Sequence, residues 1–379
     1  MKFDILSEYC FVNMGQSPAS ETYNNNADGL PFYQGNADFG EIHPQTRIWC
    51  SAPVKIANKG DLLISVRAPI GALNIATEQC CIGRGLAALT PKLDKCRIKY
   101  IYFAIQSQIN FLIANGTGST FKAVNKNTLE NLLIPVSSLN KQDEIVNIFE
   151  KLNNIINKRK EQLLLMDNAV KSRFIEMFGS LGSDKFGWGL MKLGNCCEIN
   201  PSKINDNRLK ENLYVSFIPM SCVTDDGKIT EMETKTYYEV KSGFTYFKEG
   251  DVLFAKITPC MENGKGAIAI GLYNKVGFGS TEFHVLRPIK EKCNSYWLYM
   301  VTMFSEFRLI AESNMTGSAG QKRVPVSFLE NFKISVPPIE LQNEFADFFK
   351  QTDKSKLEIQ KSLDKLEILK KSLMQQYFG

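Results

Sequence analysis

The chain has 379 residues, of which 44% are hydrophobic and 22% are charged, and its formal net charge is +5. This composition is typical of a folded globular protein with room for two domains, and the mild positive charge alone does not identify a nucleic-acid partner. No apolar run reaches the ~18 residues of a membrane span, and the N-terminus lacks a signal peptide, so we expect a cytoplasmic protein with no membrane partner.

The first 140 residues alternate short strands with one helical stretch. Gly60–Val66 and Gly71–Ala76 are apolar runs separated by Arg67-Ala68-Pro69, a pattern typical of two strands joined by a turn. Tyr100–Ala114 carries apolar residues at three- and four-residue spacing and predicts a helix. The glycine-rich segment Asn115–Phe121 predicts a loop. Residues 1–140 therefore predict a domain of the mixed α/β (α+β) class.

Residues 141–179 predict one long helix. No proline or glycine interrupts Lys141–Phe178. Alternating steps of four and three from Ile145 to Met177 meet apolar residues at eight of ten positions, which is the pattern of a coiled-coil seam. At 1.5 Å per residue this helix would be ~55 Å long.

The second half of the chain repeats the first. An offset of 200 residues joins Leu129-Glu130-Asn131 to Leu329-Glu330-Asn331 and Gln142 to Gln342. We therefore expect a second mixed α/β domain over residues 180–339 and a second long helix over residues 340–379. A period this long indicates duplicated domains, since the repeats of solenoid proteins are much shorter.

Each long helix must bury its apolar stripe, and the nearest matching stripe is on its duplicate. We predict that the two helices form an antiparallel coiled coil about a pseudo-twofold axis, with the globular domains at opposite ends. The alternative is two separate surface helices, each docked on its own domain.

The features in this order resemble the specificity subunit of type I restriction–modification enzymes. The resemblance covers essentially the whole chain and is carried by "GQSP", "GSTEFHVLRP", "TGSAGQKRV", "ISVPPIELQNEF" and the "FG" that closes each helix. The first copy departs from the second, with Phe121-Lys122-Ala123 in place of Gln321-Lys322-Arg323.

The resemblance implies two target-recognition domains, each of which reads one half of a bipartite double-stranded DNA site. The helices would set the spacing and dock two modification subunits, which bind S-adenosylmethionine and methylate adenine, and restriction subunits can join them. The specificity subunit itself would perform no catalysis and bind no cofactor. Because the two domains differ between their shared landmarks, we expect an asymmetric target.

Chemical motifs are scarce in the residues themselves. Asn200-Pro201-Ser202 lacks the second proline and the aromatic residue of an adenine methyltransferase, and Gly264-Lys265-Gly266 does not complete a P-loop. The two histidines are His43 and His284, and His284 lies in a strand-like segment where a structural role is expected. The ten cysteines include no C-x-x-C pair, which predicts buried, reduced thiols and no metal site.

DNA contacts are expected from loops that combine glycine, hydroxyl groups and cations, because these groups can approach and bind phosphates, and arginine can also pair with guanine. The alternative is an ordinary surface loop with incidental lysines. The candidate DNA-binding residues are Arg67, Arg84, Thr117, Ser119, Lys122, Lys256, Thr316, Ser318, Lys322 and Arg323.

Apolar residues beside the helix seam are candidates for docking the modification subunits. They are Ile148, Ile155, Leu164, Phe348, Leu357 and Leu369. Two other classes of protein remain open at this stage. One is a scaffold that recruits partners through its helices without DNA, and the other is an enzyme whose catalytic motif the sequence does not reveal.

Overall fold

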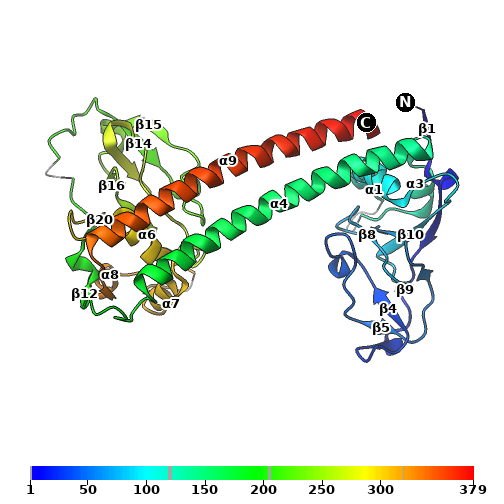
Figure 1. Ribbon diagram of the computed structural model, residues 1–379, viewed down its shortest axis with the longest axis horizontal. Coiled ribbons are helices and arrows are strands. Elements are labelled where there is room, and N and C mark those ends of the chain that lie inside the picture. The colour runs from blue at the N-terminus through cyan, green and yellow to red at the C-terminus, as the bar shows by residue number, and fades with distance from the viewer. Residues whose placement is uncertain (1, 118–121, 204–205, 319) are drawn as a thin grey trace. The chain divides into compact units, whose positions relative to one another are not determined.

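The computed structural model describes residues 2–117, 122–203, 206–318 and 320–379 (Figure 1). The chain divides into two compact units. Unit 1 comprises residues 1–161 and 360–379, and unit 2 comprises residues 162–359. Each unit therefore contains a globular part and about half of each long helix.

The helices and strands follow largely the same order in the two units. In unit 1 they are β1 (Phe3–Ile5), η1 (Leu6–Glu8), β2 (Cys10–Met14), η2 (Ser20–Thr22), β3 (Tyr23–Asn24), β4 (Leu30–Tyr33), η3 (Asn36–Asp38), β5 (Trp49–Cys50), β6 (Ile56–Ala57), β7 (Leu62–Ser65), β8 (Leu73–Ile75), β9 (Cys80–Ile82), β10 (Leu86–Pro91), α1 (Ile98–Ser107), α2 (Ile109–Ala114), α3 (Lys126–Glu130) and β11 (Leu133–Pro135). In unit 2 they are β12 (Leu190–Lys192), η4 (Leu193–Asn195), β13 (Cys197–Ile199), β14 (Tyr214–Ile218), η5 (Met220–Cys222), β15 (Glu233–Thr236), α5 (Tyr237–Val240), β16 (Thr245–Lys248), β17 (Val252–Ala255), β18 (Gly266–Ile268), η6 (Tyr273–Lys275), β19 (Val276–Gly279), β20 (Phe283–Pro288), α6 (Ser295–Met303), α7 (Ser305–Ser313), α8 (Val326–Asn331) and β21 (Lys333–Ser335). The long helices are α4 (Leu139–Phe178) and α9 (Ile339–Phe378).

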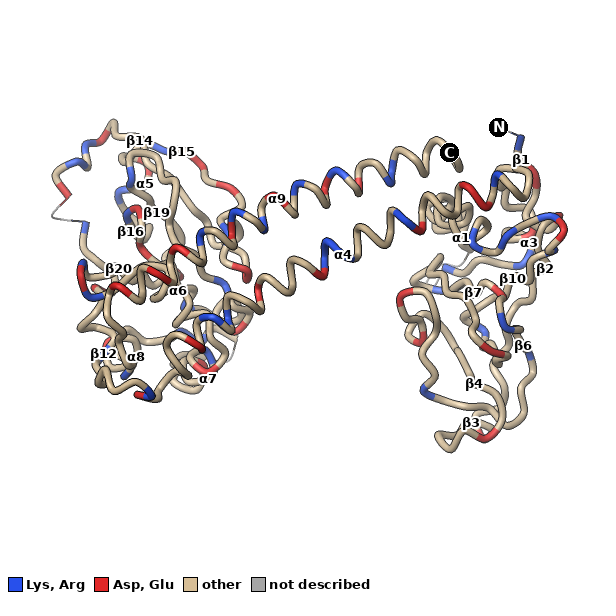
Figure 2. Tube along the Cα trace, viewed as in Figure 1, with Lys and Arg blue, Asp and Glu red and all other residues tan. Residues whose placement is uncertain are grey.

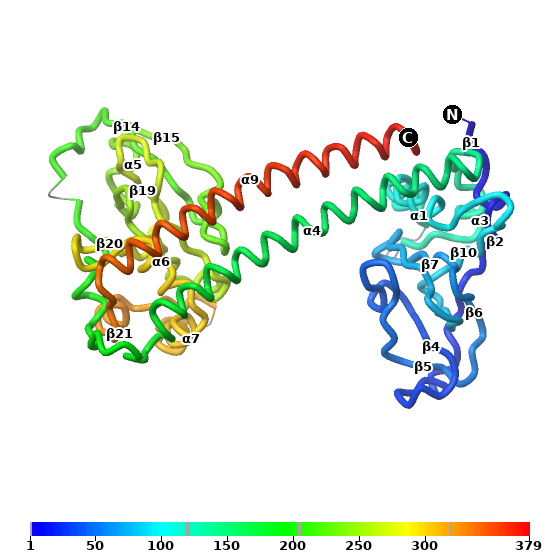
Figure 3. Tube along the Cα trace, in the orientation of Figure 1, coloured from blue at the N-terminus to red at the C-terminus, as the bar shows by residue number. Residues whose placement is uncertain are grey.

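The two long helices pack against each other in an antiparallel arrangement. In unit 1 the ring of Phe149, near the start of α4, lies 5.8 Å from the ring of Phe378 at the end of α9. In unit 2 the order is reversed, and Phe174, near the end of α4, lies 5.3 Å from Phe345 near the start of α9. Charged residues of both signs are interspersed along both helices (Figure 2). The red α9 runs beside the green α4 in Figure 3, and the predicted pairing is confirmed.

The predicted seam matches buried positions in the first part of α4 and at Val170, but not in the middle of the helix, where Arg159, Leu163 and Met166 are half-buried, and not at its end. Ile145, Phe149, Leu152, Ile156 and Val170 are buried. The expected positions Arg173 and Met177 are only half-buried, however, whereas Phe174 and Phe178 are buried. The burial shifts because the last turns of α4 contact the globular part of unit 2 as well as α9: the ring of Phe174 lies 4.9 Å from the ring of Phe304, which precedes α7.

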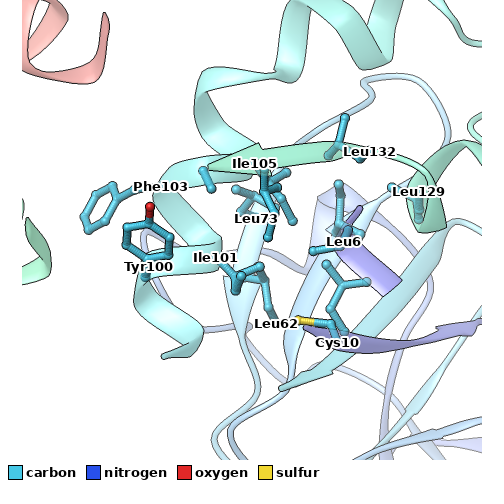
Figure 4. Packing of buried hydrophobic residues seen from close by; sticks show 14 of the residues in the cluster. Leu6, Cys10, Leu62, Leu73, Tyr100, Ile101, Phe103, Ile105, Leu129 and Leu132 are labelled. Atoms are coloured by element: carbon cyan, nitrogen blue, oxygen red, sulfur yellow. The ribbon is translucent and has the colours of Figure 1, made fainter. Parts of the chain in front are cut away.

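One antiparallel sheet, here called the inner sheet, has the same strand order in both units. The order is β2-β10-β7-β8 in unit 1 and β13-β20-β17-β18 in unit 2. All residues of β7 and β17 are buried, as expected for strands that are covered on both faces. Successive side chains of a strand point to opposite faces, so Leu62 and Ile64 join the core formed with α1, whereas Leu63 joins Ile82 of β9 on the other face. Figure 4 shows Ile101 of α1 beside Leu62.

A second sheet covers the other face and also keeps its order. The strands run β5-β4-β9-β6 in unit 1 and β15-β14-β19-β16 in unit 2, and unit 1 adds β3 beside β5. Each of these sheets contains one parallel pair, β4 with β9 and β14 with β19. The internal duplication therefore extends into a region where the two sequences share few landmarks.

The sequence predicts one helix over Tyr100–Ala114 and, by the same spacing, one over Ser295–Glu312, but each stretch consists of two helices. The break lies at Gln108 between α1 and α2, and at Phe304 between α6 and α7. Phe304 has an extended backbone, with φ −65° and ψ 137°, which ends the helical hydrogen bonding. The spacing of apolar residues continues through both breaks, which is why the sequence predicts one helix.

Eight of the ten cysteines are buried, and none forms a disulfide bond. Burial raises the pKa of the Cys80 thiol to about 12, so this group is a poor nucleophile. No helix within the described ranges combines the length and the apolar character that crossing a bilayer demands.

Candidate nucleic-acid interface

The loop Thr316–Arg323 of unit 2 is closed at its base by backbone hydrogen bonds. The Thr316 N–H donates to the Arg323 carbonyl at 3.0 Å, and the Arg323 N–H donates to the Thr316 carbonyl at 2.8 Å. The loop is then attached to the segment that follows β17, because the Val324 N–H donates to the Lys256 carbonyl at 2.9 Å. The loop is thus anchored at one end of the inner sheet.

The loop Thr117–Ala123 of unit 1 is closed and attached in the same way. Thr117 and Ala123 exchange both backbone hydrogen bonds, at 2.9 and 2.8 Å, and the Val124 N–H donates to the Val66 carbonyl at 2.8 Å. Residues 118–121 lie outside the described part of the chain, so the predicted contact residue Ser119 is not placed. The anchor itself is described in both units and is the same.

An ion pair stands at the base of the unit 2 loop. Arg323 donates two hydrogen bonds to Glu282, from Nε at 2.9 Å and from Nη2 at 2.8 Å. The arginine hydrogen bonds lower the pKa of the Glu282 carboxyl, which keeps it ionised. Lys256 is half-buried nearby, and desolvation lowers the pKa of its amine. The predicted residues Lys256 and Arg323 are therefore brought together, around a carboxylate that the prediction did not include.

A buried histidine contacts the backbone of Val324, the residue that attaches the loop of unit 2 to the inner sheet. The side chain of His284 is buried, and its Nε2 lies 2.8 Å from the carbonyl oxygen of Val324. Its Nδ1 lies 3.0 Å from Nδ2 of Asn200. Burial lowers the pKa of His284, and a neutral ring with its proton on Nε2 satisfies both contacts. His284 thus has the structural environment expected from its sequence position.

Three predicted cations of unit 1 gather at the equivalent place. Arg67 follows the Val66 carbonyl that holds the loop, and Lys122 precedes Ala123 in the loop. Arg84 is brought close because the Val66 N–H donates to the Gly85 carbonyl at 2.9 Å. All three side chains are exposed, and among the described residues none of them forms an ion pair.

The "GQSP" motif lies against the same end of the inner sheet in unit 1. The Gly15 N–H donates to the Leu86 carbonyl at 2.8 Å, and a Cβ at Gly15 would lie 2.2 Å from the Gly83 oxygen. Only glycine permits this approach. The hydroxyl of Ser17 then accepts the Arg84 N–H at 3.2 Å, so the motif supports the turn that presents Arg84. The motif is part of the family resemblance in the sequence, but no role was predicted for Ser17.

The remaining predicted contact residues of the loops are exposed. They are Thr117 in unit 1 and Thr316, Ser318 and Lys322 in unit 2. Glu282 is the main site residue that the prediction missed. Its signal was its position in "GSTEF", directly before β20, where a side chain at the end of an inner strand faces the anchored loop.

The predicted docking residues on the long helices are exposed, with one exception. The exposed residues are Ile148, Ile155, Leu164, Leu357 and Leu369. Phe348 is only partly exposed and packs against the core of unit 2, so its assignment as an exposed docking residue is wrong. The reason is that the first turns of α9 lie against the globular part of unit 2, which covers this side. Ile368 is also exposed, at 66%, and adds to the surface next to Leu369.

The loops and turns of both units offer exposed groups that are suited to binding. Within the ranges that the structure describes, no cluster of three or more His, Cys, Asp or Glu side chains could hold a metal ion. Cations, hydroxyl groups and glycine-rich backbone are what a phosphate backbone requires, and exposed arginines can also reach base edges.

A protein family and several known proteins are similar to this chain, and the family matches most of its length. The sequence profile described as "Type I restriction modification DNA specificity domain" matches residues 5–165 and 186–369. The specificity subunits of the type I restriction enzymes EcoEI and EcoAI of Escherichia coli are each 43% identical, over 155 and 168 residues. The matches cover 40% and 44% of this chain, but only 25% and 28% of those two proteins.

A solved structure shares the fold over the full length. The type I restriction–modification S subunit from M. genitalium superimposes with a TM-score of 0.60 and 12% identity, covering 100% of this chain and 96% of that one. With both halves matched by its profile, the chain belongs to the family of type I restriction modification DNA specificity domains.

Proposed function

We propose that this chain is the DNA-specificity subunit of a type I restriction–modification system and that each unit reads one half of a bipartite, asymmetric target. The observation that carries the proposal is the duplicated loop, anchored by the same backbone hydrogen bonds and surrounded by cations in both units of a chain from this family.

The DNA contacts are assigned to the exposed loops and turns. In unit 1, Arg67, Arg84 and Lys122 supply positive charge, and Thr117 and Ser119 supply hydroxyl groups. In unit 2 the corresponding groups are Lys256, Lys322 and Arg323, with Thr316 and Ser318. Cations bind the phosphates and fix the register of the complex, whereas arginine can distinguish guanine through paired hydrogen bonds.

The long helices provide the surfaces on which the modification subunits dock. Ile148, Ile155 and Leu164 on α4, with Leu357 and Leu369 on α9, present apolar side chains to solvent on helices that are already paired with each other. Two modification subunits would cover these surfaces, bind S-adenosylmethionine and methylate the DNA. This chain would contribute recognition but neither cofactor nor catalysis, and restriction subunits would join where the system has them.

Mapping methylated adenines tests the proposal directly. The chain is expressed with its modification subunits in cells without other methyltransferases, and modified positions are read across the genome. We expect two different half-sites separated by a gap of fixed length. A continuous or palindromic motif would contradict the assignment of one half-site to each unit.

The scaffold hypothesis gives a different result in a salt titration. Affinity that depends on phosphate contacts falls steeply between ~50 and ~200 mM salt, because bound counterions are released. A scaffold that binds only proteins through apolar helix faces would show no measurable affinity for duplex DNA at either salt concentration.

A further inference from the structure

A buried glutamine occupies the same position in the first turn of each long helix. Gln142 of α4 is 1% exposed and Gln342 of α9 is 0% exposed. Glutamine is rarely buried so completely, because two N–H donors and one carbonyl acceptor must then find partners inside the protein. The duplicated burial indicates a role that both copies require.

Both glutamines make the same three hydrogen bonds to backbone groups. Gln142 accepts from the Arg97 N–H at 2.8 Å and donates to the carbonyls of Lys95 and Ser137 at 3.1 and 2.9 Å. Gln342 accepts from the Asn294 N–H at 2.8 Å and donates to the carbonyls of Lys292 and Pro337, at 3.0 and 2.8 Å.

The partners show what the glutamines join. Arg97 and Asn294 occupy the positions directly before the first residues of α1 and α6, the helices that cover the inner sheets. Ser137 and Pro337 lie in the short segments that lead into the long helices. Each amide therefore fixes the start of a long helix to the helix that covers the inner sheet, and that sheet carries the anchored loop.

The buried contact is retained although its surroundings have changed. Beside Gln142, Arg97 pairs with Asp143 at 3.0 Å, and both side chains are about half exposed. At the equivalent place beside Gln342, Asn294 donates to Asn343 at 2.8 Å. An exposed pair of this kind contributes little to stability. The glutamine is thus the common element of both joints, and its backbone partners are independent of side-chain identity.

The contact made by each glutamine matters because a small change in the angle at the start of a long helix gives a large displacement at its other end. A helix of 40 residues is about 60 Å long at 1.5 Å per residue. A tilt of about 5° at its start displaces its other end by about 5 Å, which exceeds the ~3.4 Å rise of one base pair. A small loss of angular precision at the joint would therefore shift a half-site by a whole base pair.

We propose that Gln142 and Gln342 are positioning residues that fix the angle between each globular part and its long helix and thereby restrict the gap between the two half-sites. This inference rests on the proposed function. It concerns how far apart the half-sites lie, and it does not involve which bases each unit reads.

The test replaces each glutamine by methionine, which has a similar length and volume but makes none of the three hydrogen bonds. Gln142→Met and Gln342→Met are expressed with the modification subunits, and methylation is counted at sites whose gap is native, one base pair shorter or one base pair longer. We expect unchanged half-site sequences and an about tenfold drop in the preference for the native gap, as the loss of a buried hydrogen bond allows. Gln351→Met, at an exposed position of α9, is the matched control and should retain the native gap.

A purely structural role predicts another outcome. If methylation falls equally at all gaps and the preference for the native gap stays, the inference is wrong. If the methionine variants do not accumulate, Gln142→Asn and Gln342→Asn decide, since each keeps a polar amide that is one methylene too short to reach all three backbone partners: a broader range of gaps supports the inference, and an unchanged gap overturns it. Failure of the proposed function is distinct, because the unmodified protein would then yield no bipartite motif.

Discussion

The loop of unit 2 and the loop of unit 1 are held by the same backbone hydrogen bonds but have different side chains at their bases. In unit 2 the base contains Glu282, Arg323 and the buried His284. In unit 1 Ala123 stands where unit 2 has Arg323, and the Gly85 carbonyl bonds the strand end as the Glu282 carbonyl does in unit 2. The cations of unit 1 lie instead on Arg67 and Arg84, which are exposed.

This difference shows how the side chains of duplicated domains can diverge while the backbone attachment of the loop is kept. Main-chain hydrogen bonds hold each loop, so the side chains around it are free to change. Arg323 is already oriented by Glu282, and a pre-oriented side chain loses less conformational entropy on binding. Arg67 and Arg84 have no such ion-pair partner in the described part of unit 1.

The largest effect is expected from Arg323→Ala. The change removes a cation and leaves the Glu282 carboxylate without its partner, close to where a phosphate or base would lie. We expect an about 100-fold loss of affinity for the target duplex, measured by titration of labelled DNA with the assembled complex.

The double variant Arg323→Ala, Glu282→Gln separates the two causes. Removing the carboxylate should restore about tenfold of the lost affinity, because repulsion of the DNA disappears while the lost contact does not return. Equal affinities of the single and double variants would mean that Glu282 does not face the DNA.

The two arginines of unit 1 should affect only the first half-site. Arg67→Ala and Arg84→Ala each remove a group that can pair with guanine, and we expect about 10–100-fold weaker discrimination at one position of that half-site. Methylation mapping provides the measurement, because the second half-site should remain unchanged. Lys59→Ala, an exposed lysine of the same unit, is the control. Weaker discrimination between bases in the second half-site would contradict the assignment of one half-site to each unit.

The loop lysines should produce smaller and equal effects in the two units. Lys122→Ala and Lys322→Ala each remove one exposed cation next to an anchored loop. If each lysine neutralises one phosphate, the slope of log affinity against log salt should decrease by about 1 in either variant, with no change in sequence preference. A changed slope in only one variant would show that the two loops approach DNA differently.

The fold could be predicted from the sequence because apolar residues recur at regular spacing. The site could be predicted only in part because its contacts follow no such spacing. The seam from Ile145 onward and the apolar runs Gly60–Val66 and Gly71–Ala76 predicted the paired helices and the inner-sheet strands, since a period of 3.5 or 2 residues depends only on which residues are apolar. The breaks at Gln108 and Phe304 were missed because apolar spacing continues through them. Phe348 was misassigned because seam spacing does not indicate where a globular part covers the helix.

The site depended on pairings that no local pattern encodes. Arg323 and Glu282 are separated by 41 residues and meet only because their strands and loop share one end of the sheet. Gln142 was noted as part of the repeat, but its burial and backbone partners follow from how α1 meets α4. The motifs therefore indicated which segments matter, whereas the three-dimensional contacts were needed to assign their roles.

The smallest expected effect concerns the pH dependence of unit 2. Burial lowers the pKa of His284 below its ordinary value of 6.5, so the folded protein binds this proton less readily than the unfolded chain. The stability contributed by the neutral ring is complete above pH 6.5 and is lost as the pH falls below that value. We expect the advantage of the wild type over His284→Gln, about 2–4 °C in the unfolding midpoint at pH 7.5, to be smaller at pH 5.5. His43→Gln, at an exposed position in unit 1, should shift neither midpoint. An advantage that is the same at both pH values would mean that the contribution of His284 does not depend on a neutral ring.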